Sequence, residues 1–366
     1  MSRARDFADL AGSADAGGIT GKSLVINGAM AVSQRSVSDT SVHESGFYSC
    51  DRWSVFYNAE DELRNTITQA SDGPDGFANS LKIETTTAES AVASDERFYV
   101  MYKAEAQDLQ SLGFGTSAAQ KTTLSFYVKS SVTGTYAVSL YQSDGNDLIG
   151  STYTINSANT WERKELTFAG NTAAAIADDN GIGIIIYFGI MLGSDWTSGS
   201  NTSWAEFADA NFFAGHAQNG VATTTNATWQ LTGVKWEVGS SATPFDHSES
   251  YGETLERCKR YYQRTTTGGN AYTNLSVVGC YSTGTDQRGT IPFTTEMRTG
   301  PALSTSGNLM VLGLGGGLAS ISAGDGISTH HAGIRVNTNS NLTAGQVAIL
   351  RGNNDTTAHL QFDAEL

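Results

Sequence analysis

The sequence predicts an all-β protein: a jelly-roll β-sandwich, one short linking helix, and then a second, smaller β-sandwich. Three observations lead to this prediction. Gly, Ser, Thr and Asn are abundant, only 4 residues are proline and 16% are charged, which suits short strands joined by tight turns. Alternating apolar and polar residues recur from Ser23 to Ser248. A single helical pattern follows, and strand-like segments then resume.

The first sandwich is predicted over residues 23–248, with about eight to ten strands. Apolar and polar side chains alternate over residues 53–57, 124–129 and 136–140. Turn signals rich in Asp, Asn and Gly separate such stretches at residues 72–76, 144–146 and 179–181. The run Ile184–Phe188 is continuously apolar, which predicts a strand that is covered on both faces.

The linking helix is predicted over residues 249–264. Ser250 and Glu253 have the spacing of a capping box at its start. An apolar stripe then recurs at helical spacing, and its members are assigned a structural role: Tyr251, Leu255, Cys258 and Tyr262. A helix of about four turns is not stable alone, so we expect it to pack on a sandwich or on copies of itself.

The C-terminal sandwich is predicted over residues 265–366. Its Thr-, Ser-, Asn- and Gly-rich sequence contains five strand-like stretches, which are residues 275–281, 289–293, 333–337, 346–350 and 359–362.

Charge and composition exclude several classes of function. The net charge of −15 argues against nucleic-acid binding through phosphate neutralisation. No apolar run is long enough for a spanning helix, and the N-terminus has no signal-peptide core, so we expect no membrane insertion and no secretory signal. The three cysteines, Cys50, Cys258 and Cys280, have no metal-ligand spacing and are expected to be small buried residues.

No catalytic residue, cofactor or metal site is predicted. The sequence contains neither a Gly-x-Ser-x-Gly elbow nor a His-Glu-x-x-His helix. The carboxylates of Asp144, Asp147, Asp178 and Asp179 lie in turn-like contexts, where Asp caps local backbone groups. A calcium role for these loops is an open alternative.

Tryptophan supplies the ligand-binding prediction. Trp53, Trp161, Trp229 and Trp236 lie in strand patterns and are expected in the core. Trp196 and Trp204 occur in a polar loop without an obvious burial partner, so they are predicted to bind a ligand; the alternative is that they close one end of the sandwich. Asp51, Arg52 and Trp53 are predicted to be structural, with a buried Arg–Asp pair that fixes strand ends.

The segment from Trp236 to Tyr262 resembles a signature of tail-fibre-like virion proteins of bacteriophages, especially those that infect marine bacteria. The likeness extends over most of the chain and is densest between Ser23 and Arg264. His247 is followed by Ser248, where the family has arginine. The matching segments include Glu237-Val238-Gly239, Ala242 to His247, Cys258 to Tyr262, Met1 to Asp6, Ile26 to Met30, Gln34-Arg35 and Asp51-Arg52-Trp53.

The resemblance implies a structural virion protein rather than an enzyme, either a tail fibre or a similar appendage. It implies a location in the virion after assembly in the host cytoplasm, a homotrimer, and binding to host surface polysaccharide. Residues 1–22 would dock to another virion protein, and Arg3, Arg5 and Asp6 are the candidate docking residues. Two alternatives remain open: a capsid-bound fibre or decoration protein, and a polysaccharide depolymerase.

Overall fold

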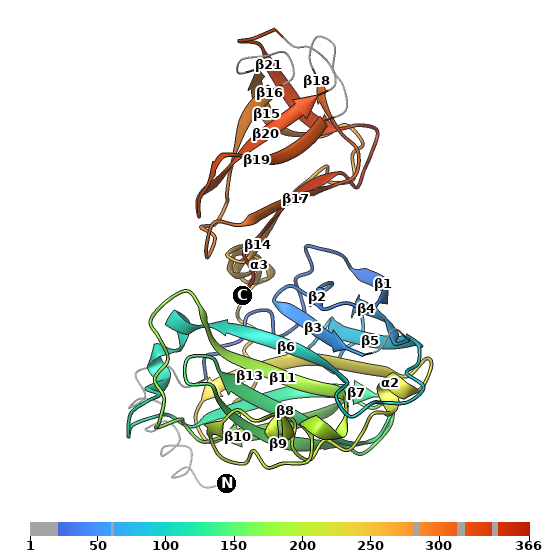
Figure 1. Ribbon diagram of the computed structural model, residues 1–366, viewed down its shortest axis with the longest axis vertical. Coiled ribbons are helices and arrows are strands. Elements are labelled where there is room, and N and C mark those ends of the chain that lie inside the picture. The colour runs from blue at the N-terminus through green and yellow to red at the C-terminus, as the bar shows by residue number, and fades with distance from the viewer. Residues whose placement is uncertain (1–20, 60–61, 281–285, 313–318, 339–342) are drawn as a thin grey trace. The chain divides into compact units, whose positions relative to one another are not determined.

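The computed structural model describes residues 21–59, 62–280, 286–312, 319–338 and 343–366. The fold is all-β with one short linking helix, as the sequence predicts (Figure 1). The chain divides into two compact units, and the boundary falls between Thr254 and Leu255. The predicted docking residues Arg3, Arg5 and Asp6 lie outside the described residues.

The first unit contains two antiparallel sheets, named sheet A and sheet B here. Sheet A has six strands in the order β1 (Ser38–Val42), β4 (Arg64–Ala70), β5 (Ser80–Thr87), β13 (Thr228–Val238), β7 (Thr122–Ser130) and β10 (Glu162–Phe168). Sheet B has seven strands in the order β12 (Ala205–Glu206), β9 (Asp147–Ile155), β8 (Gly134–Gln142), β11 (Ile182–Leu192), β6 (Arg97–Glu105), β3 (Trp53–Asn58) and β2 (Gly46–Phe47). The strands exceed the predicted number partly because β2 and β12 are only two residues long.

Short helical segments connect or cover these strands. They are the 3₁₀ helices η1 (Ala106–Leu112), η2 (Ser194–Trp196) and η3 (Asp209–Asn211) and the single-turn helix α2 (Gly220–Thr223).

Aromatic side chains fill the space between the two sheets. The ring of Phe188 on β11 lies 5.2 Å from that of Phe126 on β7 and 6.2 Å from that of Trp229 on β13, measured between centroids. Trp53 lies 6.2 Å from Phe188 on the other side of this cluster. Trp53, Trp229 and Trp236 are all buried, as predicted. Phe188 meets Phe126 edge-to-face, and aromatic contacts of this kind stabilise a core beyond the area that they bury.

Strand β11 is buried on both faces, which confirms the prediction from its continuous apolar sequence. Its inward residues face the aromatic core, and its outward residues contact the segment 193–219. Tyr187, for example, points outward and lies 4.8 Å from Phe212, ring to ring. A chain segment therefore covers the middle of sheet B.

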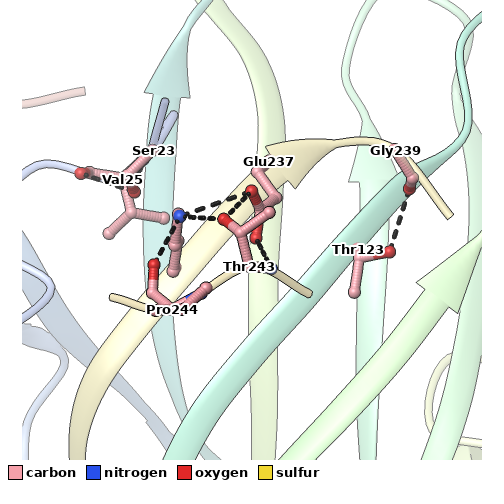
Figure 2. Close-up of polar contacts among 8 residues, drawn as sticks. Ser23, Val25, Thr123, Glu237, Gly239, Thr243 and Pro244 are labelled. Atoms are coloured by element: carbon pink, nitrogen blue, oxygen red, sulfur yellow. Dashed lines mark hydrogen bonds and ion pairs between the residues drawn. The ribbon is translucent and has the colours of Figure 1, made fainter. Parts of the chain in front are cut away.

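Strand β13 is also buried on both faces, but its outer face carries charge. Lys235 and Glu237 form an ion pair at 3.3 Å with side-chain exposures of 2% and 0%. Thr243 donates its hydroxyl and its backbone N–H to the two oxygens of Glu237, at 2.6 and 2.8 Å. Lys235 Nζ donates to the carbonyl of Pro244 at 2.9 Å. Figure 2 shows Thr243 lying against Glu237, with Pro244 next to it in the chain. The segment after β13 therefore folds back over sheet A and satisfies the buried pair.

A second buried network joins the N-terminal part of the first unit to β3. Gln34 donates from its backbone and side-chain nitrogens to the two carboxylate oxygens of Asp51. Asn27 donates to the carbonyl of Asp51 at 2.9 Å and accepts from Trp53 Nε1 at 3.2 Å. Arg52 donates to the carbonyl of Lys103 at 2.6 Å. Asp51, Arg52 and Trp53 are at most 2% exposed, in agreement with a structural role.

The linking helix α3 spans Tyr251–Lys259, so it is shorter than predicted. The capping box is present: Ser250 Oγ accepts from Glu253 N at 3.3 Å, and Glu253 Oε2 accepts from Ser250 N at 2.7 Å. Of the predicted apolar stripe, Cys258 is buried and Leu255 is half-buried. Tyr251, in contrast, is 60% exposed. Tyr251 is the first residue of the helix, and its side chain lies outside the part of the helix that is buried. Tyr262 is buried as the first residue of β14, because the chain is already extended there.

The second unit is a smaller antiparallel β-sandwich. One sheet has the order β14 (Tyr262–Thr266), β22 (His359–Asp363) and β17 (Ala302–Ser306). The other has the order β18 (Leu309–Leu312), β21 (Val347–Gly352), β15 (Asn274–Cys280), β16 (Asp286–Pro292), β20 (His331–Thr338) and β19 (Ala319–Ile327). All five predicted strands are present, and β14, β17, β18 and β19 were missed.

We predict that Lys235→Met destabilises the first unit by about 3–5 kcal/mol, because it leaves the buried carboxylate of Glu237 without its cation. All 6 tryptophans precede the unit boundary, so tryptophan fluorescence during urea unfolding reports on this unit alone.

The control is the double variant Lys235→Met/Glu237→Gln, which removes both charges and should recover a substantial part of the loss. If the double variant loses as much stability as Lys235→Met and Glu237→Gln lose together as single variants, the two charges are not coupled.

Candidate functional site

The two outer faces of the first unit differ in how much of the sheet remains open. On sheet B, residues 193–219 lie over the centre and form an aromatic cluster with the strands. Its buried members include Tyr99, Ile185, Tyr187, Trp196, Phe212 and Phe213. On sheet A, the cover formed by residues 240–247 lies over β13 and leaves the edge strand β10 open.

Trp196 is not the exposed side chain that the sequence predicts. It is only 8% exposed, and its Nε1 donates to the carbonyl of Asp95 at 2.9 Å. Phe213 N donates to the carbonyl of Trp196 at 2.8 Å, which brings Phe212 and Phe213 against the loop. The sequence shows the polar neighbours of Trp196, but it does not show these partners that fold back on it. Trp196 therefore secures the cover of sheet B.

Trp204 is half-buried at another part of the same segment. Its Nε1 donates to the carbonyl of Ala169 at 2.6 Å, and its ring meets Phe114 edge-on at 5.7 Å. Trp204 and Trp196 have different partners, so the structure does not bring them together in one site. A binding role for Trp204 stays a prediction.

His216 anchors the end of this cover beneath the surface. Its Nδ1 accepts from Ala137 N at 3.2 Å, which requires the proton to be on Nε2, and Nε2 donates to the carbonyl of Gln218 at 2.7 Å. Burial lowers the pKa of His216 to about 4, because the charged imidazolium would lose its hydration there.

Trp161, which the sequence places in the core, is instead half-buried on the outer face of sheet A. Strand β10 pairs with β7 so that Arg163 lies opposite Tyr127 and Leu166 opposite Leu124. Leu166 and Phe168 point into the core, and side chains alternate between faces, so the odd-numbered residues from 161 to 167 point outward. A pattern of alternation does not by itself reveal which half faces water.

Polar side chains surround the indole of Trp161. Lys129 Nζ lies 5.0 Å from its ring centroid and also forms an ion pair with Asp72. Asp72 Oδ1 lies 3.4 Å from the indole Nε1. Partial burial opposes ionisation of Asp72, but the hydrogen bonds and charge of Lys129, together with Trp161 and Gln230, lower its pKa below the usual value. We call Trp161, Lys129, Asp72, Gln230 and Tyr127 the Trp161 surface.

This arrangement has the chemistry of a sugar-binding surface. The apolar C–H face of a pyranose stacks on an indole, and the carboxylate and ammonium beside it can exchange hydrogen bonds with ring hydroxyls. Gln230 is only 5% exposed and hydrogen-bonds to Asp72. The sequence signal was a tryptophan at the start of a strand with alternating Glu and Arg or Lys, but the register needed to interpret it was missing.

The predicted acidic turns have local structural roles. Asp179 Oδ1 accepts from Gly181 N at 2.8 Å, and Asp144 Oδ2 accepts from Ala177 N at 2.9 Å. Asp147 accepts from the side chain of Asn171 at 2.7 Å. Among the described residues, no group of three His, Cys, Asp or Glu side chains is arranged to hold a metal ion. None of the helices within the described ranges is long and apolar enough to cross a membrane.

Comparisons with known proteins identify no family for this chain. No family model and no curated protein matches it. Solved structures with likeness include a putative sugar-binding protein from Bacteroides thetaiotaomicron, at 11% identity and a TM-score of 0.31, covering 60% of this chain and 100% of that one. Another is a family 11 carbohydrate-binding module of Clostridium thermocellum, at 13% identity and a TM-score of 0.29, covering 55% and 99%.

A third is the enzymatically active domain of bacteriophage CBA120 tailspike protein 4, at 12% identity and a TM-score of 0.30. The match covers 51% of this chain but only 19% of the tailspike chain. Likeness at this level assigns neither a ligand nor an activity to this chain.

We predict that the first unit loses about 3 kcal/mol of stability as the pH falls from 6.5 to about 4, because the unfolded chain takes up a proton that folded His216 excludes. Urea unfolding followed by tryptophan fluorescence across this range measures the loss. His216→Gln retains a donor for the carbonyl of Gln218. It should reduce the slope of the unfolding free energy against pH by the equivalent of about one proton.

The range between pH 4.5 and 6.5 isolates this effect. Carboxylates with a lowered pKa, such as Glu162 at about 2, withdraw their contribution only at lower pH. An unchanged slope in His216→Gln would assign the acid sensitivity to other groups.

Proposed function

We propose that this protein is a structural component of a bacteriophage particle, a tail fibre or a similar appendage, which binds host surface polysaccharide through the Trp161 surface. The observation that supports binding is the half-buried indole of Trp161, which lies on the outer face of sheet A beside Asp72 and Lys129. The virion role is supported by the sequence resemblance described above.

The Trp161 surface is held in position before a ligand arrives. Asp72 fixes the indole and the ammonium of Lys129 through hydrogen bonds, so these side chains lose little rotamer freedom on binding. Binding to preorganised groups costs less entropy than binding to free side chains. A shallow, open surface with one indole gives weak affinity for a single sugar unit, and several copies on one particle would raise the avidity.

Binding without catalysis is the proposed mode of action. Glycoside hydrolysis commonly requires two carboxyl groups that flank the scissile bond. On the Trp161 surface, Asp72 already accepts hydrogen bonds from three side chains and has a lowered pKa, which suits it to orient hydroxyls and not to donate a proton. Residues 1–22 would attach the protein to its neighbour in the particle.

Self-association into the proposed trimer has a candidate surface on the second unit. Val277 on β15 and Leu312 on β18 each pair with Ile349 of β21, and Val347 is the first residue of that strand. Val277, Leu312 and Val347 are 63%, 40% and 72% exposed. Apolar side chains gathered on one sheet face are typical of an interaction surface.

We predict that Trp161→Ala lowers the affinity for a bound polysaccharide by about 10-fold or more, because loss of an aromatic stacking partner costs about 1–3 kcal/mol. Affinity electrophoresis of the full chain through gels with neutral and acidic polysaccharides identifies the ligand and measures the change. Trp204→Phe is the matched control.

Retained binding in Trp161→Ala with lost binding in Trp204→Phe would move the site to the segment 193–219. New reducing ends in the treated polysaccharide would replace the proposal with the depolymerase alternative. Antibody labelling of intact particles separates a tail location from a capsid location.

We also predict that light scattering gives the mass of three 38.7 kDa chains. The double variant Val277→Thr/Val347→Thr should shift the protein toward smaller species, because it removes exposed apolar surface from the proposed interface. Val37→Thr alters a residue that is 60% exposed in the first unit and should leave the mass unchanged. A monomeric wild-type protein would contradict the trimer.

A further inference from the structure

Arg97 is the first residue of β6. It is half-buried on the outer face of sheet B, and its Nε is buried without a hydrogen-bond partner. Its two Nη atoms make no hydrogen bond within the described residues, yet they are not among the buried unpartnered atoms. They therefore reach solvent with their donors unused.

Arg97 also has no carboxylate partner among the described residues. Five other cations of the first unit contact a carboxylate within 4.0 Å, namely Lys82, Lys129, Arg163, Lys164 and Lys235. No carboxylate in the described part of the chain lies within that distance of Arg97. In a chain with a net charge of −15, a guanidinium without an acidic neighbour is an available anion-binding group.

Aromatic rings hold this guanidinium in place. Its central carbon lies 3.8 Å from the ring centroid of Trp196 and 5.0 Å from that of Phe56. Phe56 in turn stacks on Tyr99, with centroids 4.8 Å apart and planes 6° apart. Cation–π contacts with two rings restrict the side chain, and Trp196 is itself fixed by its hydrogen bond to Asp95.

We propose that Arg97 and Phe56 form a second binding site, which takes the carboxylate or sulfate group of an acidic polysaccharide. A guanidinium presents paired N–H groups in the geometry that a carboxylate or sulfate accepts in bidentate fashion. The half-buried ring of Phe56 beside it gives an apolar surface for the C–H face of the sugar that carries the charged group.

This inference rests on the proposed function only in its choice of a polysaccharide as ligand. The site itself is separate, because Arg97 lies on sheet B and Trp161 adjoins sheet A. It also gives the buried Trp196 a second role: the indole that secures the cover of sheet B orients the guanidinium.

Titration calorimetry on the full chain with three polymers tests the proposal. Polygalacturonate carries carboxylates, dextran sulfate carries sulfates, and dextran carries neither. We expect Arg97→Met to lower the affinity for at least one acidic polymer by about 10-fold or more, since hydrogen bonds to charged groups are worth that much. Affinity for an uncharged polymer should not change.

Two further variants guard the interpretation. Arg97→Lys keeps the charge and the packing stem but loses the paired N–H geometry, and it should bind acidic polymer more weakly than the wild type. Arg163→Met removes the same charge from a cation that contacts Glu165, and it should behave like the wild type. Tryptophan fluorescence confirms that each variant remains folded around Trp196.

Wild-type affinity in Arg97→Met would overturn the proposal, as would an equal loss in Arg163→Met, which would assign the effect to net charge. An inability of the wild type to bind either acidic polymer would also overturn it. Binding of a neutral polymer that still depends on Trp161 would then leave the proposed function standing. The polymer that responds to Arg97 identifies carboxylate or sulfate as the recognised group.

Discussion

The architecture of the first unit depends on covering the outer faces of both sheets. Strands β11 and β13 are buried on both sides, so each requires a second layer that is not a sheet. On sheet B that layer is aromatic, built from residues such as Trp196, Phe212 and Phe213. On sheet A it is polar and depends on the Lys235–Glu237 pair, which Thr243 and Pro244 satisfy. Burying a charge pair costs free energy unless its other hydrogen-bonding groups also find partners. The covering segment buries the Lys235–Glu237 pair and also supplies those partners.

The residues that carry the family resemblance are mostly those that maintain this construction. Asn27, Gln34 and Asp51 share one hydrogen-bond network, Glu237 and Thr243 share another, and Ser250 with Glu253 caps the linking helix. None of these groups belongs to the Trp161 surface or to the Arg97 site. The part of the resemblance that these groups carry therefore concerns how the fold is held together.

The sequence could predict what depends on local pattern and could not predict what depends on pairing. The apolar run Ile184–Phe188 identified a strand covered on both sides, because no polar residue interrupts it. The position of Trp161 was predicted wrongly because alternation defines two strand faces but not which of them faces solvent. The register of β10 with β7 is needed to decide this. Trp196 was misplaced because its partners, Phe213 and Arg97, are distant in sequence. Strand β14 was missed because the helical pattern was extended to residue 264, and β17 was missed because its Ser and Thr content resembles that of a loop.

The same covering layers determine where a ligand can be recognised. With the centre of each sheet occupied, open side chains remain at the sheet edge beside β10 and at the start of β6. An acidic exterior repels polyanions, but at about 0.1 M salt this repulsion is screened beyond roughly 10 Å. At contact distance the outcome is decided by individual groups, and a restricted guanidinium selects by the geometry of its donors as well as by charge. Under the proposed assignment, the net charge of −15 therefore suppresses nonspecific adhesion to polyanions, while the Arg97 site admits those polymers whose charged group fits its paired donors.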